Sequence, residues 1–183
     1  MVKVLVSFGI FCALLTTASA QTPSPSDIQE GFLSLKDGTR IHFLEAGRSS
    51  SVPALVFIPG WTLPAFLWME QIQRFSSDRL VIAIDPRSQG DSSVTEQGNT
   101  PEQRASDIRE ILSTRQIRKV VLVGWSQGAN DVAAYVQQFG TDSIAGLVFV
   151  DSPVSAGPAE IEINKDWSQQ FFRMISVYAN HPL

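Results

Sequence analysis

The order of apolar runs, turns and helical patterns predicts an α/β fold, with a mostly parallel sheet and helices on both faces. The first expected element is a β-hairpin, in which an Asp-Gly turn joins residues 32–35 to residues 40–44. Four short apolar runs follow, and because they do not alternate with polar residues they are typical of strands buried on both faces of a parallel sheet. These runs are residues 54–58, 80–84, 120–123 and 147–150.

Helical patterns lie between the predicted strands. The first, over residues 66–75, places apolar side chains at intervals of three: Phe66, Met69, Ile72 and Phe75. The second begins after Thr100, which supplies an N-cap before a proline at the first helical position, and Gln103 can close a capping box. A third amphipathic helix is predicted over residues 129–139. Alternation of strands and helices places ligands outside the carboxyl ends of the strands.

The first 20 residues have the layout of a secretory signal peptide. Lys3 precedes an apolar run over residues 4–15, and a small-residue end predicts cleavage after Ala20. An uncleaved membrane anchor is the alternative, but the 12-residue run is shorter than the roughly 18–20 residues that span a bilayer. We therefore expect a secreted or periplasmic protein without stable membrane insertion. Residues 21–30 form a predicted flexible lead-in, and residues 31–153 the core.

The composition indicates an ordinary globular domain, with 44% hydrophobic and 17% charged residues among 183. A net charge of −4, with Lys and Arg scattered along the chain, argues against a nucleic-acid partner. The single cysteine, Cys12, lies in the predicted signal peptide, so the mature chain is expected to form no disulfide and no thiolate metal site. No cofactor or metal is implied, the expected partner is a small-molecule substrate, and the oligomeric state stays open.

The strongest chemical signal is a Gly-X-Ser-X-Gly pattern at residues 124–128, between a predicted strand and a predicted helix. A serine on so sharp a turn has strained backbone geometry, and side chains at Gly124 and Gly128 would collide with the neighbouring strand and helix. The turn would expose the Ser126 hydroxyl as a nucleophile at the sheet edge, beside backbone N–H groups that stabilise an oxyanion. The alternative is that Ser126 is only a helix N-cap.

Two other strand ends carry residues suited to the same site. Pro59-Gly60-Trp61 follows the first parallel strand, and the backbone N–H of Trp61, paired with that of Gln127, is the candidate oxyanion hole. Trp61 is alternatively a core aromatic, which is compatible with a main-chain donor. Asp85 and Arg87 follow the next strand, and we expect them to hold a loop in place rather than to take part in chemistry.

With these motifs in order, the chain resembles the α/β-hydrolase superfamily between about residues 32 and 153, most closely its esterase, haloperoxidase-like and proline-iminopeptidase-like branches. The resemblance rests on Pro59-Gly60-Trp61, on the Asp-X-Arg-X-X-Gly-X-Ser segment at residues 85–92, and on the serine turn. Two positions depart from the usual pattern: Pro59 replaces a His, and Ser88 replaces a Gly. The serine nucleophile disfavours haloalkane dehalogenases and epoxide hydrolases, whose nucleophile is Asp.

Acyl transfer by serine needs a base, and the family order is Ser, then Asp or Glu, then His. His42 precedes Ser126 within a predicted strand, so a structural role is expected for it. His181 lies two residues from the chain end, where a base is seldom held in place. Asp151 ends the last predicted strand and is the candidate acid, with a turn-capping aspartate as the alternative.

The resemblance implies eight strands, of which six are counted, so the sequence predicts an N-terminal portion of a secreted serine hydrolase that lacks the catalytic His. The complete enzyme would cleave an ester, or a small amide or thioester, through an acyl-Ser126 intermediate, and the 183-residue chain itself would have little turnover. Residues 154–183 are expected to begin a helical cap, or to form a terminal helix. The alternatives are a catalytically silent binding module and a cofactor-free haloperoxidase or perhydrolase.

Overall fold

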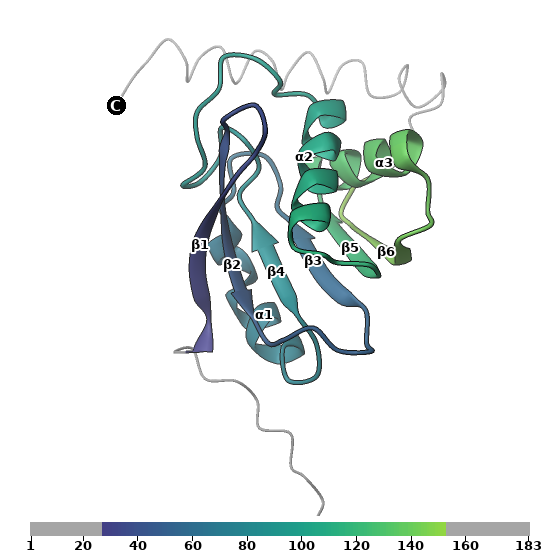
Figure 1. Ribbon diagram of the computed structural model, residues 1–183. Helices are drawn as coiled ribbons and strands as arrows, with labels where there is room; N and C mark the ends of the chain where they lie inside the picture. Colours follow the sequence, from purple (N-terminus) through teal and green to yellow (C-terminus); the bar gives the residue numbers. More distant parts are fainter. Residues whose placement is uncertain (1–26, 153–183) are drawn as a thin grey trace, which may run out of the picture.

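The computed structural model describes residues 27–152, so the predicted signal peptide and the predicted cap lie outside the described residues. Figure 1 shows one layer of strands between helices. The strands are β1 (Gln29–Ser34), β2 (Arg40–Ala46), β3 (Ala54–Ile58), β4 (Val81–Ile84), β5 (Val120–Trp125) and β6 (Ile144–Val150). The helices are the 3-10 helix η2 (Ala65–Trp68), α1 (Met69–Phe75), α2 (Pro101–Thr114) and α3 (Gln127–Phe139).

The strands form one sheet in the order β1-β2-β4-β3-β5-β6. β1 pairs antiparallel with β2, and β2 pairs antiparallel with β4. The remaining pairs, β4 with β3, β3 with β5 and β5 with β6, are all parallel. The prediction of a hairpin that leads into a mostly parallel sheet is therefore confirmed. The first strand begins at Gln29, two residues inside the predicted lead-in.

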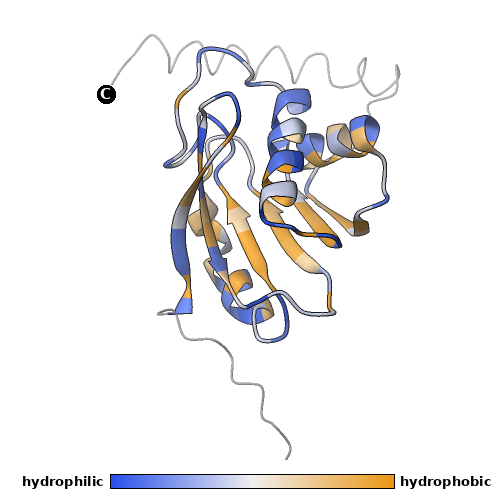
Figure 2. Ribbon diagram, viewed as in Figure 1, coloured by the Kyte–Doolittle hydropathy of each residue, from blue (hydrophilic) through white to orange (hydrophobic). Residues whose placement is uncertain are grey.

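The two faces of the sheet carry separate hydrophobic clusters, as the pleat of a strand requires. Val56 of β3 and Ile82 of β4 contribute to the cluster that contains residues of α2 and α3. Their strand neighbours Leu55 and Val81 contribute to the cluster on the other face, which contains residues of η2 and α1. Figure 2 shows the resulting hydrophobic band along the central strands. Helices on both faces, as predicted, thus cover β3 and β4, which are apolar at every position.

The prediction of an apolar face at residues 66, 69, 72 and 75 is wrong in part. The segment starts as a 3-10 helix, and the side chains that face the sheet are those of Ala65, Trp68 and Ile72. Phe66 is 65% exposed and Phe75 43% exposed. The three-residue period of a 3-10 turn places Ala65 and Trp68 on one side, and this sets which side of α1 is buried.

The outermost strands differ in burial from the central ones. Every residue of β3 and β4 is buried, whereas β6 alternates between exposed and partly buried residues. In the described part of the chain β6 pairs with β5 alone, and Val148 and Val150 are 43% and 38% exposed. The expectation that residues 147–150 are buried on both faces is therefore not met. Within residues 27–152, no helix has the length and hydropathy that crossing a membrane requires.

A buried charge pair lies where α2 packs against α3. Arg104 of α2 and Asp131 of α3 are 5% and 0% exposed, and their nearest charged atoms are 3.9 Å apart, which is too long for a hydrogen bond. Burial raises the pKa of Asp131 from 3.8 to about 7, with Arg104 opposing the rise and Asp107 adding to it. An ionised Asp131 therefore destabilises the fold at alkaline pH.

This charge makes stability depend on pH in a defined window. Between about pH 4 and pH 7 the folded state keeps a proton on Asp131 that the unfolded chain releases. The free energy of unfolding consequently falls as pH rises across that window, by on the order of 4 kcal/mol from this group. Asp131→Asn removes the charge, so we expect the variant to exceed the wild type in stability at pH 8 and to match it near pH 4, as measured by urea unfolding. Asp142→Asn, which removes the same charge at an exposed position, is the control. If the free energies of unfolding of Asp131→Asn and the wild type differ by the same amount at pH 4 and pH 8, the pKa shift of Asp131 is not the cause.

Candidate active site at the carboxyl ends of the strands

Ser126 occupies the sharp turn between β5 and α3. Its backbone angles, φ 50° and ψ −116°, lie in a region that L-residues rarely adopt, and such strain costs about 1–3 kcal/mol. The residue is exposed, and its side chain makes no capping hydrogen bond to the helix. Ser126 is the N-cap residue of α3 by position, but its backbone is not extended and its hydroxyl accepts no capping hydrogen bond, so helix capping alone does not explain a serine here. The turn presents the hydroxyl to solvent instead.

The glycines on either side of Ser126 are required by close backbone approaches. A Cβ at Gly124 would overlap the carbonyl group of Gly128, and a Cβ at Gly128 would overlap the carbonyl oxygens of Ile58 and Pro59. The neighbours here are backbone atoms, which cannot rotate away as a flexible side chain could. The predicted reason for the two glycines is confirmed, and the start of α3 is packed against both β5 and the end of β3.

The segment after β3 lies beside the serine, as predicted. A Cβ at Gly60 would lie 3.3 Å from the Cβ of Ser126, so the two backbones are neighbours. The Leu63 N–H donates to the Gly60 carbonyl at 3.2 Å, which closes a turn around Trp61. The Trp61 side chain is 46% exposed and is not a core aromatic. Whether its N–H serves as an oxyanion donor stays a prediction.

The other candidate donor, Gln127, is the first residue of α3. Backbone N–H groups in the first turn of a helix have no carbonyl partner within that helix. The 13-residue helix also directs the positive end of its dipole at this point. Negative charge that develops beside Ser126 would therefore be stabilised here.

Asp151 lies at the same edge of the sheet as Ser126. Trp125 of β5 pairs with Val150 of β6, and the Ser126 N–H donates to the Val150 carbonyl at 2.9 Å. Ser126 and Asp151 thus follow directly from paired residues of adjacent parallel strands. Asp151 is exposed and has a positive φ of 51°, so it sits on a tight turn at the strand end. This placement is compatible with the predicted acid, whose role stays a prediction.

His42 has structural partners at both ring nitrogens. It is 4% exposed in β2, with Nδ1 2.7 Å from Asp85 Oδ2 and Nε2 3.1 Å from Glu30 Oε1. These contacts agree with the structural role expected for it and leave it unsuited to deprotonate Ser126. The other histidine, His181, lies outside the described residues.

Asp85 connects the loops around the site, which the sequence indicated only in general terms. Its carboxylate is 1% exposed and accepts hydrogen bonds from the Ala65 N–H at 2.5 Å and the Asp91 N–H at 2.9 Å, in addition to contacting His42. Ala65 is the first residue of η2, which immediately follows the turn that carries Trp61. A Cβ at Gly90 would overlap the Asp85 carboxyl group. Asp85 therefore holds the segment after β3 and the turn after β4 together.

Arg87 anchors the same turn to α2. Its guanidinium donates two hydrogen bonds of 2.6 Å to the two carboxylate oxygens of Asp107, and a third of 3.0 Å to Asp37 in the hairpin. The hydrogen bonds from Thr39 and from Arg87 hold the pKa of Asp37 below its usual value. The expectation that Asp85 and Arg87 hold a loop in place is confirmed.

The close approach at Gly128 can be tested by adding one methyl group. Gly128→Ala should lower the free energy of unfolding by more than the 1–3 kcal/mol typical of overpacking, because the new Cβ meets backbone. Gly146→Ala in β6 is the matched control, since its Cβ would meet only Val121 side-chain atoms at 3.4 Å or more. The measurement is chemical unfolding of both variants. Equal effects of the two substitutions would contradict the packing described for the start of α3.

Comparison with known proteins agrees with this geometry. Residues 53–182 match the family model described as alpha/beta hydrolase fold. The chain is 28% identical over 123 residues to a bifunctional esterase/perhydrolase of Acinetobacter calcoaceticus, a match that covers 67% of this chain and 44% of that protein. It is 32% identical over 115 residues to a soluble epoxide hydrolase of Corynebacterium sp. (strain C12), which covers 63% of this chain and 39% of the relative.

Among solved structures, a bromoperoxidase from Bacillus anthracis is similar, with a TM-score of 0.61 and 28% identity. That match covers 66% of this chain and 44% of the bromoperoxidase. The chain thus spans less than half the length of these relatives. Because the family match extends over most of the sequence, this chain belongs to the α/β-hydrolase family.

Proposed function

We propose that this protein is a serine hydrolase that cleaves an ester, or a small amide or thioester, through an acyl-Ser126 intermediate. The observation that carries the proposal is the backbone of Ser126: a strained, exposed residue at the start of α3, with Gly60 packed beside it. A hydroxyl so presented, beside main-chain N–H groups at a helix start, suits attack on a carbonyl carbon. Membership of a hydrolase family supports the same reaction class.

In the proposed mechanism, a base removes the Ser126 hydroxyl proton while the oxygen attacks the substrate carbonyl. The carbonyl oxygen, which becomes negatively charged, accepts hydrogen bonds from the N–H groups of Trp61 and Gln127. The leaving alcohol takes the proton from the base as its bond to the carbonyl carbon breaks. Water then attacks the acyl carbon and gives a proton to the base, and the base returns that proton to the Ser126 oxygen as the acid leaves. Asp151, at the adjacent strand end, orients the base. These steps require no cofactor.

The base is proposed to be a histidine outside residues 27–152, because His42 is committed to Asp85 and Glu30. Val148 and Val150 of β6 are exposed, and the matched segment covers only 44% of the Acinetobacter relative. Both observations support a longer protein of which this chain is the N-terminal portion. The competing proposal is a catalytically silent binding module. A reading frame that continues beyond the Leu183 codon for roughly 80–120 residues and encodes a late histidine supports the enzyme. A stop codon at that point contradicts it.

Export is part of the proposal. The signal-peptide pattern of residues 1–20 supports a secreted or periplasmic protein that begins at Gln21 after cleavage. The N-terminal residue of protein recovered from the extracytoplasmic fraction tests this directly, since an uncleaved chain would retain Met1.

A second candidate function is perhydrolysis at the same serine, which the name of the Acinetobacter relative favours. The two reactions share the acyl-Ser126 intermediate and differ in the second step. Hydrogen peroxide, in place of water, would attack the acyl carbonyl, release a peroxy acid and return the proton to Ser126. Formation of peroxy acid from a short carboxylic acid and hydrogen peroxide, compared with ester hydrolysis by the same preparation, distinguishes them.

The serine is tested by Ser126→Ala in the protein expressed from the complete reading frame. Removal of the nucleophile should lower kcat/KM for a p-nitrophenyl ester by at least about 10³-fold, because no acyl-enzyme can form. Ser113→Ala, at an exposed position of α2, is the matched control and should leave turnover unchanged. Normal turnover after Ser126→Ala would overturn the proposed mechanism.

A further inference from the structure

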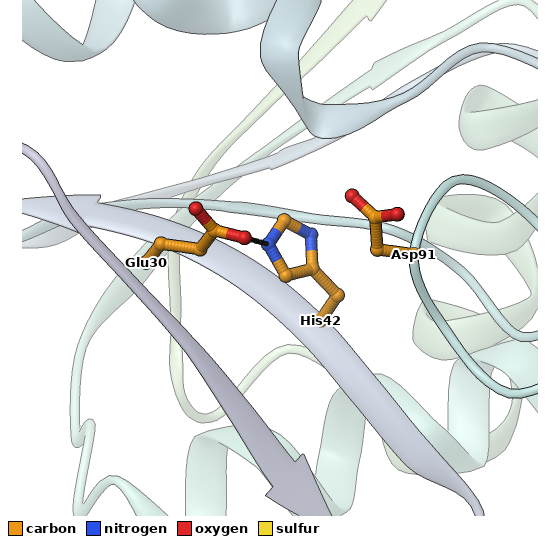
Figure 3. A group of neighbouring side chains, drawn as sticks. All are labelled: Glu30, His42 and Asp91. Atoms are coloured by element: carbon orange, nitrogen blue, oxygen red, sulfur yellow. Dashed lines mark hydrogen bonds and ion pairs between the residues drawn. The ribbon is translucent and has the colours of Figure 1, made fainter.

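Three potential metal ligands converge at the hairpin side of the sheet, one of them within the motif at residues 85–92. Glu30 of β1, His42 of β2 and Asp91 of the turn after β4 each offer one ligand atom, and these atoms all lie within 4.8 Å of one another. Figure 3 shows the two carboxylates on either side of the His42 imidazole. The imidazole is buried, whereas Glu30 and Asp91 are exposed, so the group is open to solvent on one side.

The hydrogen bonds of His42 define which nitrogen is available. Carboxylates only accept hydrogen bonds, and a neutral imidazole carries a single N–H, so neutral His42 can donate to Asp85 Oδ2 or to Glu30 Oε1 but not to both. The shorter contact, 2.7 Å from Nδ1 to Asp85 Oδ2, favours the tautomer with the proton on Nδ1. Nε2 then faces Glu30 Oε1 at 3.1 Å, which places one acceptor opposite another unless a cation lies between them. That cation is either a second proton, which makes His42 an imidazolium, or a metal ion.

The local charge favours a divalent ion. Three carboxylates, those of Glu30, Asp85 and Asp91, gather around one imidazole. A single proton on Nε2 offsets only one of these negative charges. Of the nearby arginines, Arg87 is paired with Asp107 and Asp37, and Arg40 lies 4.3 Å above the Phe32 ring.

We propose that Glu30, His42 and Asp91 form a binding site for a divalent transition-metal ion of the Zn²⁺ type. One imidazole nitrogen and two carboxylate oxygens, completed by water, are a ligand set that Zn²⁺ accepts. Bond lengths of about 2.0–2.1 Å in a tetrahedral site separate two ligand atoms by roughly 3.3 Å, close to the 3.1 Å between His42 Nε2 and Glu30 Oε1. Asp91 lies on the opposite side of the imidazole from Glu30 (Figure 3), so its exposed side chain would have to rotate toward Nε2 to complete the site.

Asp85 supplies the outer contact that such sites use. A metal-bound histidine usually donates its other N–H to a carboxylate, which fixes the tautomer and the ring orientation. The Asp85–His42 hydrogen bond is of this kind, and Asp85 is itself held by the N–H groups of Ala65 and Asp91. The ion would join β1 and β2 to the turn after β4, and it would stabilise the fold in proportion to its affinity.

The test is a titration of tag-free, chelator-treated full-length chain with ZnCl₂, followed by calorimetry and by thermal unfolding. We expect one saturable site per chain and a rise in Tm on addition of Zn²⁺. Glu30→Gln and Asp91→Asn, both at exposed positions, should each weaken Zn²⁺ binding by more than about tenfold and reduce the Tm shift.

Two control variants locate the ion. His181→Gln removes the other histidine of the chain, and Asp142→Asn removes an exposed carboxylate elsewhere, and both should leave Zn²⁺ affinity unchanged. No saturable binding to the wild type, or binding that both Glu30→Gln and Asp91→Asn leave intact, overturns the proposal. The outcome is independent of Ser126, because binding and Tm are read without any substrate.

Discussion

The close packing of the first turn of α3 against the ends of β3 and β5 is the constraint on which the rest of the site depends. Gly128 lies so near the carbonyls of Ile58 and Pro59 that no side chain fits there, and Gly124 lies equally near Gly128. The chain enters α3 through a sharp turn in which Ser126 has a positive φ of 50°. The same contact brings Gly60 beside the serine. The close backbone approach at Gly128 is therefore linked both to the exposed position of Ser126 and to the position of the loop that contains Gly60.

The buried carboxylate of Asp85 holds the loop that carries Trp61 in place. Asp85 accepts hydrogen bonds from Ala65 and Asp91 and contacts His42, so one carboxylate ties together the segment after β3, the turn after β4 and strand β2. Buried carboxylates are tolerated when several donors surround them, and each donor then has a fixed position. Asp85 thus acts on the candidate site through the backbone of the loop that carries Trp61.

Much of the fold could be predicted because its signals are local in the sequence. The apolar runs at β3 and β4 are continuous because both faces of these strands are covered. The turn at Ser126 is recognisable because its two glycines and its serine lie within five residues. The buried face predicted for residues 66–75 is wrong at Phe66 and Phe75, since the 3-10 start of the segment and the hydrogen bond from Ala65 to Asp85 favour a different inward side.

The contacts between residues of distant segments could not be predicted from local sequence patterns. Glu30, His42 and Asp91 come from three separate segments and meet only because β1 pairs with β2 and the turn after β4 folds beside them. The Arg104–Asp131 pair likewise depends on how α2 packs against α3. The positions of Ser126 and Asp151 at one sheet edge follow from the parallel register of β5 and β6, and the predicted mostly parallel sheet implied a common edge for such residues.

The central claim is that the strained turn makes Ser126 a nucleophile. The most direct measurement is reaction of the protein from the complete reading frame with a fluorophosphonate, followed by peptide mass spectrometry to locate the adduct. The account predicts one phosphonyl group per chain, bound to Ser126 in the peptide that contains residues 124–128. Ester hydrolysis by a preparation in which Ser126 stays unlabelled, or a label on another residue, would contradict it.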